Sequence, residues 1–315
     1  MKPSVCAHVL IHSHAGLLSA EHLESGSRSM LPGLKLVSRP PLLLTFAKTM
    51  TRWGIRGGNR LVGLFRQLGL LDVVVQYHLG RGVRFNVPLF RADTCWDQRD
   101  IEDYERRLVH WSCRLLESLT DVVLFDCGAD IGTFSALVCS QTSSVARVVA
   151  FEPNPDVEAF LKHNLSYLKV SSLAITKAVS CFEGTGRLEV PDYDSSDHAR
   201  YLVPGDGSLE VVTIDSFGVR SGDVAIKIDV GGGELDVLKG AAQTISSART
   251  CMVALEANPR VVRRTKRDPV ECLRFLQSLR PFSFVIAETA ETPSTSGPVI
   301  KNRQKGTRNV IGWTS

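Results

Sequence analysis

The stretch that decides the fold runs from Val122 to Pro155 and reads VVLFDCGADIGTFSALVCSQTSSVARVVAFEPNP. It begins with an apolar run that ends in Asp126, and a second apolar run ends just before Glu152. Between the two runs lie a glycine-containing turn and a short amphipathic segment. Consecutive apolar positions are typical of a parallel strand that helices cover on both faces. The order of strand, turn, helix and strand therefore predicts the first unit of a doubly wound sheet.

The turn after Asp126 carries the most specific chemical signal. In doubly wound sheets, ligands bind at the carboxyl ends of the strands. Gly128 and Gly132 bracket the turn, so the chain can bend sharply and a ligand can approach the backbone closely. Glu152 follows Gly132 by twenty residues, where an acid accepts hydrogen bonds from ribose hydroxyls. These features predict a site for an adenosine-containing cofactor; the alternative is a glycine turn that serves only strand-to-helix geometry.

The residue in the middle of the turn indicates which cofactor binds. A dinucleotide site prefers G-x-G-x-x-G, whereas this turn reads D-C-G-A-D-I-G and places Asp130 in the middle. A carboxylate there would repel a pyrophosphate, but it would attract a sulfonium and a free amino group. The pattern favours S-adenosylmethionine over NAD.

Three separated motifs resemble the FkbM-type class I methyltransferases. They are D-C-G-A-D-I-G-T-F (126–134), A-F-E-P-N-P (150–155) and I-K-I-D-V-G-G-G-E-L-D-V-L-K-G-A (226–241). The likeness extends from about Asp121 to the C-terminus. It implies S-adenosylmethionine-dependent O-methylation of a hydroxyl on a sugar, a glycan or a secondary metabolite. The residues expected to contact the cofactor are Asp126, Gly128, Asp130, Gly132, Glu152 and Asn154.

Candidate catalytic residues follow the predicted strand 223–229. Asp229 and Glu234 are expected on the acceptor side of the cleft, where a carboxylate could take a proton from the acceptor hydroxyl. His198 is a third candidate, although a loop histidine is usually only solvated. Where the family usually has a glutamate, this chain has Gly231. Either one of the three candidates accepts the proton, or the chain is a decayed cofactor-binding module. An NAD-dependent oxidoreductase is a further alternative.

The remaining patterns complete the fold prediction. Strands are expected at 173–179, 251–256 and 282–287, and a final antiparallel strand at 309–313. An extended pair is expected within 182–215, and a single amphipathic helix over 101–115. We predict a seven-stranded, mostly parallel, Rossmann-like sheet of the class I methyltransferase kind with an N-terminal helical extension. The expected divisions are a poorly defined segment 1–50, an α/β extension 51–120 and a cofactor-binding domain 121–315.

Composition limits the partners of the chain. The 315 residues carry a net charge of +4, and no apolar run is long enough to span a membrane. Eight cysteines without a C-x-x-C pair favour core thiols in a reducing cytoplasm over metal ligands. Basic runs at 260–267 and 301–308 favour an anionic glycan, lipid-linked or nucleotide-linked acceptor over nucleic acid, because no aromatic residues interleave with them. For residues 61–77, packing on the main domain is favoured over membrane-surface contact.

Overall fold

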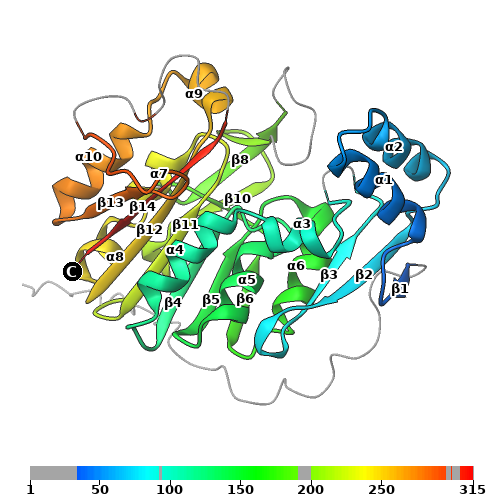
Figure 1. Cartoon of the computed structure of the whole chain (residues 1–315). Coiled ribbons are helices and arrows are strands. Elements are labelled where there is room, and N and C mark those ends of the chain that lie inside the picture. Colours follow the sequence, from blue (N-terminus) through cyan, green and yellow to red (C-terminus); the bar gives the residue numbers. More distant parts are fainter. Residues whose placement is uncertain (1–33, 92–93, 191–199, 296–298, 300–305, 315) are drawn as a thin grey trace, which may run out of the picture.

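The computed structural model describes residues 34–91, 94–190, 200–295, 299 and 306–314. Its centre is a seven-stranded sheet in the order β13-β14-β12-β11-β4-β5-β6, in which β14 alone runs antiparallel to its neighbours (Figure 1). The strand bounds are β4 Val122–Cys127, β5 Val145–Phe151, β6 Ser171–Ile175, β11 Asp223–Ile228, β12 Thr250–Ala257, β13 Ser283–Ile286 and β14 Arg308–Trp313. The predicted doubly wound sheet and its final antiparallel strand are confirmed.

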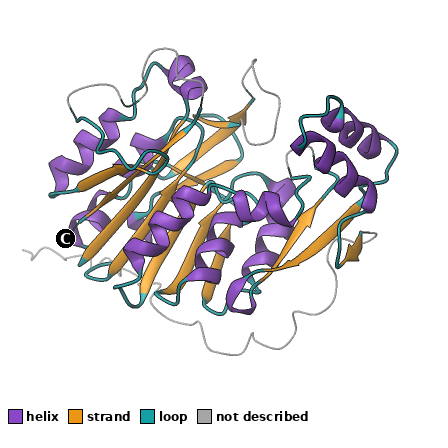
Figure 2. Cartoon of the chain, in the orientation of Figure 1, coloured by secondary structure: helices purple, strands orange, loops and turns teal. Residues whose placement is uncertain are grey.

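Helices cover both faces of this sheet (Figure 2). Neighbouring strand residues alternate between two apolar cores: Leu124 lies in one, and Phe125 lies in the other. The first core contains α4 (Arg106–Leu116), α5 (Thr133–Gln141) and α6 (Glu158–Leu165). The second contains α7 (Glu234–Lys239), α8 (Ala242–Ser247) and α10 (Val270–Leu279). Burial on both faces explains why the central strands are apolar at consecutive positions.

Residues before the sheet form a small α/β unit. Its order is β1 (Lys35–Val37), α1 (Leu42–Arg52), α2 (Gly58–Gln67), β2 (Val73–His78), η1 (Gly80–Gly82) and β3 (Arg84–Pro88), with β1, β2 and β3 in one sheet. Phe85 of β3 belongs to the same core as Phe134 of α5. The Asn164 side chain on α6 also accepts from the backbone N–H of Asn86 and donates to its carbonyl. The unit therefore packs on the main sheet through both apolar and polar contacts.

The helix predicted over 101–115 is two helices. α3 (Gln98–Asp103) and α4 are separated at Tyr104 and Glu105, and Glu105 has a left-handed φ of +40°. The apolar spacing continues across this break, so periodicity alone could not locate it. The break matters because it directs Glu105 toward a buried group of charges described below.

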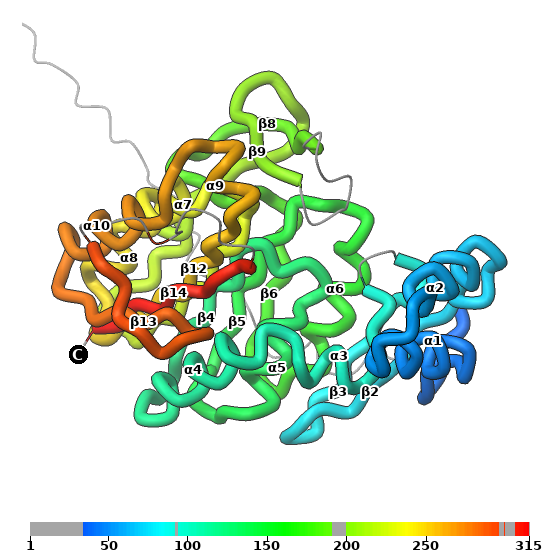
Figure 3. Tube along the Cα trace, turned by 45° about the horizontal axis from the view of Figure 1, so that its top comes forward, coloured from blue at the N-terminus to red at the C-terminus, as the bar shows by residue number. Residues whose placement is uncertain are grey.

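The extended pair predicted within 182–215 belongs to a second sheet of four strands. The order is β7-β10-β8-β9, from β7 (Ala178–Val179), β8 (Gly184–Glu189), β9 (Tyr201–Pro204) and β10 (Leu209–Val212). The strand predicted at 173–179 is thus divided between β6 and β7. Figure 3 shows β8 and β9 above the carboxyl ends of the central strands. The remaining elements are η2 (Pro155–Val157), η4 (Asp215–Phe217) and α9 (Pro259–Thr265).

Several sequence predictions lie outside the described residues. They are the segment 1–33, most of the loop that contains His198, and residues 301–305 of the second basic run. Across the part of the chain that the structure describes, every helix is too short or too polar to cross a bilayer.

Candidate functional site

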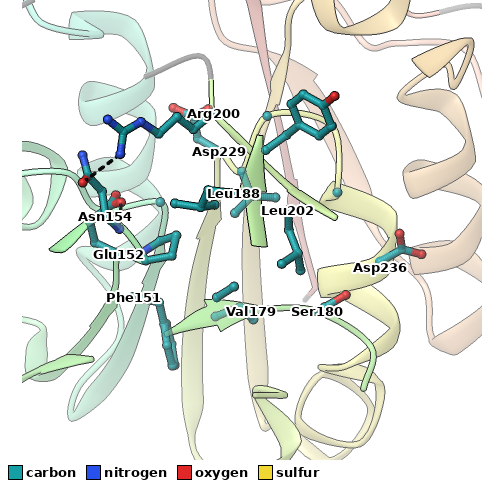
Figure 4. A pocket seen from close by; sticks show the side chains of 18 of the residues that line it. Phe151, Glu152, Asn154, Val179, Ser180, Leu188, Arg200, Leu202, Asp229 and Asp236 are labelled. Carbon is teal, nitrogen blue, oxygen red and sulfur yellow. Dashed lines mark hydrogen bonds between the residues drawn. The ribbon is translucent and has the colours of Figure 1, made fainter. Parts of the chain in front are cut away.

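A cavity of about 520 Å³ lies where the carboxyl ends of β4, β5 and β11 meet the four-stranded sheet (Figure 4). Four of the six predicted cofactor residues line it: Gly128, Asp130, Glu152 and Asn154. Asp229, a predicted proton acceptor, lines the same cavity. The structure thus brings together residues that are about a hundred positions apart in the chain.

Glu152 is held by the backbone of the glycine turn. One carboxylate oxygen accepts the N–H of Asp130 over 2.9 Å, and the other accepts the N–H of Asn154 over 2.9 Å. Burial raises the pKa of Glu152 to about 7, although these two N–H groups act in the opposite direction. Each carboxylate oxygen has a second lone pair, so the group can still accept hydrogen bonds from a ligand in the cavity.

Gly128 is required by the close approach of two strands. Its φ is +77°, and a Cβ atom at this position would lie 1.9 Å from the carbonyl oxygen of Asp229. No side chain fits there without moving β11. The glycine therefore sets the distance between the cofactor turn and the predicted proton acceptor.

Asp130 has a left-handed φ of +47°, and its carboxylate binds Arg91. The distance from Arg91 Nη1 to Asp130 Oδ1 is 2.8 Å, and the Arg91 side chain is 7% exposed. This ion pair offsets the negative charge that was expected to select a sulfonium. Asp130 thus helps to shape the turn through its N–H, and its electrostatic contribution to ligand choice is reduced.

Asn154 connects the turn to the four-stranded sheet. Its side-chain oxygen accepts the N–H of Asp156 over 3.1 Å and so caps the short helix η2. The same oxygen accepts a hydrogen bond from Arg200 Nη1 over 3.1 Å, which Figure 4 shows as a dashed line. Arg200 directly precedes β9, so this contact closes one side of the cavity.

Asp126 and Gly132 do not line the cavity. Asp126 is fully buried, and it accepts a hydrogen bond from Ser135 Oγ over 2.6 Å. Burial raises the pKa of Asp126, an effect that the nearby Lys227 opposes. Gly132 has φ +87° at the start of α5, where a Cβ would contact Leu161. Both residues therefore stabilise the turn and do not face the cavity.

Lys227 is the centre of a buried group of charges. Its side chain is 3% exposed, and its Nζ lies 3.5 Å from Asp229 Oδ2 and 3.8 Å from Asp126 Oδ1. Burial alone would lower the pKa of Lys227, but the carboxylates of Asp229 and Asp126 outweigh burial and raise it well above its ordinary value. Lys227 therefore stays charged and holds the two acids in place.

Two further acids complete this group. Burial, together with the charge of Asp229 and a hydrogen bond to it, raises the pKa of Glu256 far above its ordinary range. Glu256 is therefore protonated at neutral pH and can donate to Asp229. Burial raises the pKa of Glu105 to about 7, and its side chain forms a hydrogen bond with Asn309. Asp229 thus sits between a cation and a protonated acid.

The other two predicted proton acceptors are placed differently. Glu234 turns back on its own loop, where Oε1 accepts the N–H of Gly232 over 2.7 Å, and it does not line the cavity. His198 lies outside the described residues. Asp229 is the only one of the three that the structure places at the cavity.

Gly231 occupies a position that disfavours the usual glutamate. Its φ is +68°, and a Cβ would lie 2.9 Å from the carbonyl oxygen of Arg200. Arg264 donates to the Gly231 carbonyl, and its guanidinium lies 3.9 Å from the centre of the Tyr201 ring. The space beside Gly231 is therefore occupied by β9 and α9.

Several cavity residues were not predicted as site residues. In the sequence, Arg264 and Arg267 belong to a basic run, and Arg200, Tyr201 and Leu202 lie on the short strand β9 or next to it. Lys227, which does not line the cavity, has one sequence signal: a lysine within the otherwise apolar run 224–228 needs a buried partner.

Comparisons with known proteins identify the family of the chain. Residues 126–280 match the family model described as the methyltransferase FkbM domain. The chain is 31% identical over 185 residues to the hexuronic acid methyltransferase AglP of Haloferax volcanii. The match covers 56% of this chain and 72% of that protein.

Two solved structures share lower similarity. The methyltransferase FkbM of Methylobacillus flagellatus is 18% identical, with a TM-score of 0.40, over 68% of this chain and 47% of that one, so the chain spans about half its length. M. jannaschii TYW2 in complex with AdoMet is 14% identical, with a TM-score of 0.38, over 76% of this chain and 84% of that one. The family assignment rests on the family model and the Haloferax relative: the chain belongs to the FkbM family of methyltransferases.

Proposed function

We propose that the protein transfers a methyl group from S-adenosylmethionine to a hydroxyl of a sugar or glycan. The observation that carries this proposal is the shared cavity, which both Glu152 and Asp229 line. Its volume of about 520 Å³ falls within the range of about 300–1,000 Å³ that is common for small-molecule sites. The arrangement suits a cofactor and a second reactant that meet in one space.

The residues of the turn fit S-adenosylmethionine. The Glu152 carboxylate is fixed by two backbone N–H groups and would accept hydrogen bonds from the ribose hydroxyls. Gly128 leaves the backbone of the turn open to close approach. When bound, S-adenosylmethionine supplies an electrophilic methyl group on its sulfonium.

Asp229 is the proposed acceptor of the hydroxyl proton. Lys227 and the protonated Glu256 hold its carboxylate, so its position does not depend on the ligand. A fixed carboxylate beside a bound hydroxyl can remove the proton as the oxygen attacks. The role of Asp229 thus replaces that of the glutamate that Gly231 excludes.

We propose an acceptor that carries an anionic group. Arg264 and Arg267 line the cavity, and Arg267 also pairs with Asp236 over 3.0 Å. Arginine is well suited to binding carboxylate and phosphate. The Haloferax relative is named for its action on hexuronic acid, which is an acidic sugar. An acidic sugar in a glycan is therefore the first acceptor to test.

The test follows transfer of labelled methyl from S-adenosylmethionine to acidic and neutral glycans by the purified chain. Calorimetry with S-adenosylhomocysteine and with NAD, at matched concentrations, separates a methyltransferase from a dehydrogenase. We expect binding of S-adenosylhomocysteine, no binding of NAD, and label in the acidic glycan. Cofactor binding without transfer to any glycan would instead support a cofactor-binding module.

A further inference from the structure

The outer face of α1 is apolar although it points to solvent. Leu42, Phe46 and Trp53 are 86%, 59% and 77% exposed. Their spacing of four and seven residues places them on one side of the helix. The opposite side buries Leu44 and Ala47 completely. α1 therefore has two apolar faces, and among the described residues only one of them has a partner.

This apolar surface extends through the following turn and α2. Of the eleven large hydrophobic residues that are exposed in the described chain, nine lie between 34 and 71. Besides Leu42, Phe46 and Trp53, they are Leu36, Leu43, Ile55, Leu64, Leu68 and Leu70. Such a concentration marks an interaction surface, because isolated exposed hydrophobic residues are common but clusters are not. We call these nine residues the α1–α2 face.

The charge of the same stretch has one sign. Residues 34–71 contain two lysines and five arginines, with no aspartate or glutamate. Lys48 and Arg52 pair with Asp97 and Asp100, which fastens α1 to the residues around the start of α3. The others include Lys35, Arg39, Arg56 and Arg60, which are exposed and form no ion pair within the described residues.

We propose that the α1–α2 face binds the surface of a membrane that contains anionic lipid. Apolar side chains, with a tryptophan that can sit at headgroup level, would enter the interface, and basic residues beside them would attract the anionic headgroups. A protein partner selected by apolar contact alone would not require an acid-free stretch. Because the described helices are too short to cross a bilayer, the face would lie on the membrane.

The position of the face suits an acceptor carried on a lipid. In Figure 1, α1 and α2 lie along the upper edge of the molecule, toward which the carboxyl ends of β4 and β11 also point. α9 and β8, which border the cavity, lie along this edge as well. Contact of this edge with a membrane would bring the cavity near the lipid surface.

The experiment measures sedimentation of the full chain with vesicles. One set contains phosphatidylcholine alone, and the other contains phosphatidylcholine with phosphatidylglycerol. We expect binding to the anionic vesicles only, weakened by salt, with a blue shift of tryptophan emission. Because Trp53 is exposed, Trp53→Phe should reduce the shift and leave sedimentation nearly unchanged.

Two double variants test the two parts of the proposal. Arg56→Glu with Arg60→Glu should lower vesicle binding at least about twenty-five-fold, since each basic residue near an anionic surface contributes about five-fold. Phe46→Ser with Trp53→Ser should lower it at least about ten-fold. The matched controls are Lys169→Glu and Leu173→Ser, which change exposed residues outside the face, just before β6 and within it, and should bind as the wild type does.

Three outcomes would overturn the proposal. They are no binding to anionic vesicles, equal losses in the control variants, and a vesicle-independent dimer that Phe46→Ser with Trp53→Ser dissociates. The last would make the face a contact between two copies of the chain. None of these outcomes affects transfer to a glycan in solution, so the proposal fails independently of the proposed function.

Discussion

Lys227 Nζ donates a hydrogen bond to the carbonyl oxygen of Gly128 over 3.0 Å. This bond joins β11, which Asp229 directly follows, to the turn that carries the cofactor-side residues. Lys227 is buried, and it also lies between Asp126 and Asp229. One buried cation therefore sets the relative position of the two halves of the site.

Replacing Lys227 should destabilise the folded protein. Lys227→Met keeps the length of the side chain but leaves the buried Asp126 and the partly exposed Asp229 without their cation, so we expect a loss of about 3–5 kcal/mol in the free energy of unfolding. Urea denaturation measures it. Lys239→Met is the control, since Lys239 pairs with Asp236 at the surface and should cost less than about 1 kcal/mol. Similar losses in both variants would mean that Lys227 has no special role.

The protonated state of Glu256 predicts a dependence of stability on pH. The folded chain holds a proton that the unfolded chain releases above about pH 4.5, so the stabilisation is present at low pH and is lost as pH rises. Glu256→Gln keeps a hydrogen-bond donor without an ionisable group. From pH 5 to pH 8, the free energy of unfolding of the variant should therefore rise relative to that of the wild type, by up to about 1.4 kcal/mol per pH unit.

The control for Glu256 is Glu158→Gln at the surface. Its partner Lys162 lowers the pKa of Glu158, so Glu158 is ionised throughout that range. The free energy of unfolding of Glu158→Gln should therefore change with pH in parallel with that of the wild type. Parallel curves for wild type and Glu256→Gln would show that Glu256 is ionised in the folded protein. Activity gives a second check, because Glu256→Gln should keep most of kcat if the acid only donates to Asp229.

Glu152 is predicted to bind the cofactor. Glu152→Ala should weaken S-adenosylhomocysteine binding by about 1.5–3 kcal/mol, as loss of a hydrogen bond to a charged group typically does. Because burial raises the pKa of Glu152 to about 7, the wild-type affinity should increase between pH 6 and pH 8 as the carboxylate ionises. Glu152→Gln should remove that increase. Calorimetric titration measures both effects, and unchanged affinity in a folded Glu152→Ala protein would exclude this role.

Gly231 should not tolerate the glutamate that the family usually carries. With φ at +68° and the Arg200 carbonyl 2.9 Å from a Cβ, Gly231→Glu is expected to cost about 1–3 kcal/mol of stability and to raise no activity. Gly222→Ala is the control, since nothing lies within 4 Å of its Cβ position. A more active Gly231→Glu protein would indicate that the wild type has lost its proton acceptor.

The sequence predicts the central sheet well because its signals are local. The apolar runs of β4 and β5, the glycine turn and the acid at Glu152 all lie within one short stretch. The break at Glu105 could not be predicted, because the apolar spacing runs through it without interruption. Asp130 was interpreted as a charge that selects the cofactor, but its partner Arg91 lies 39 positions earlier and is visible only in the fold.

The acceptor side of the site was harder to predict for the same reason. Lys227, Glu256 and Glu105 meet at the ends of β11 and β12 and at the start of α4, which are far apart in the chain. Sequence spacing proposed Asp229 and Glu234 equally. Only the fold shows that Asp229 lines the cavity while Glu234 binds its own loop.

The most direct test is methyl transfer by Asp229→Asn. Asparagine has nearly the same shape but cannot accept the hydroxyl proton, so kcat for transfer from S-adenosylmethionine to the glycan should fall about 100- to 10,000-fold. Affinity for S-adenosylhomocysteine should stay close to that of the wild type, and Glu234→Gln, a matched change outside the cavity, should keep most of kcat. Wild-type kcat in Asp229→Asn would contradict the account.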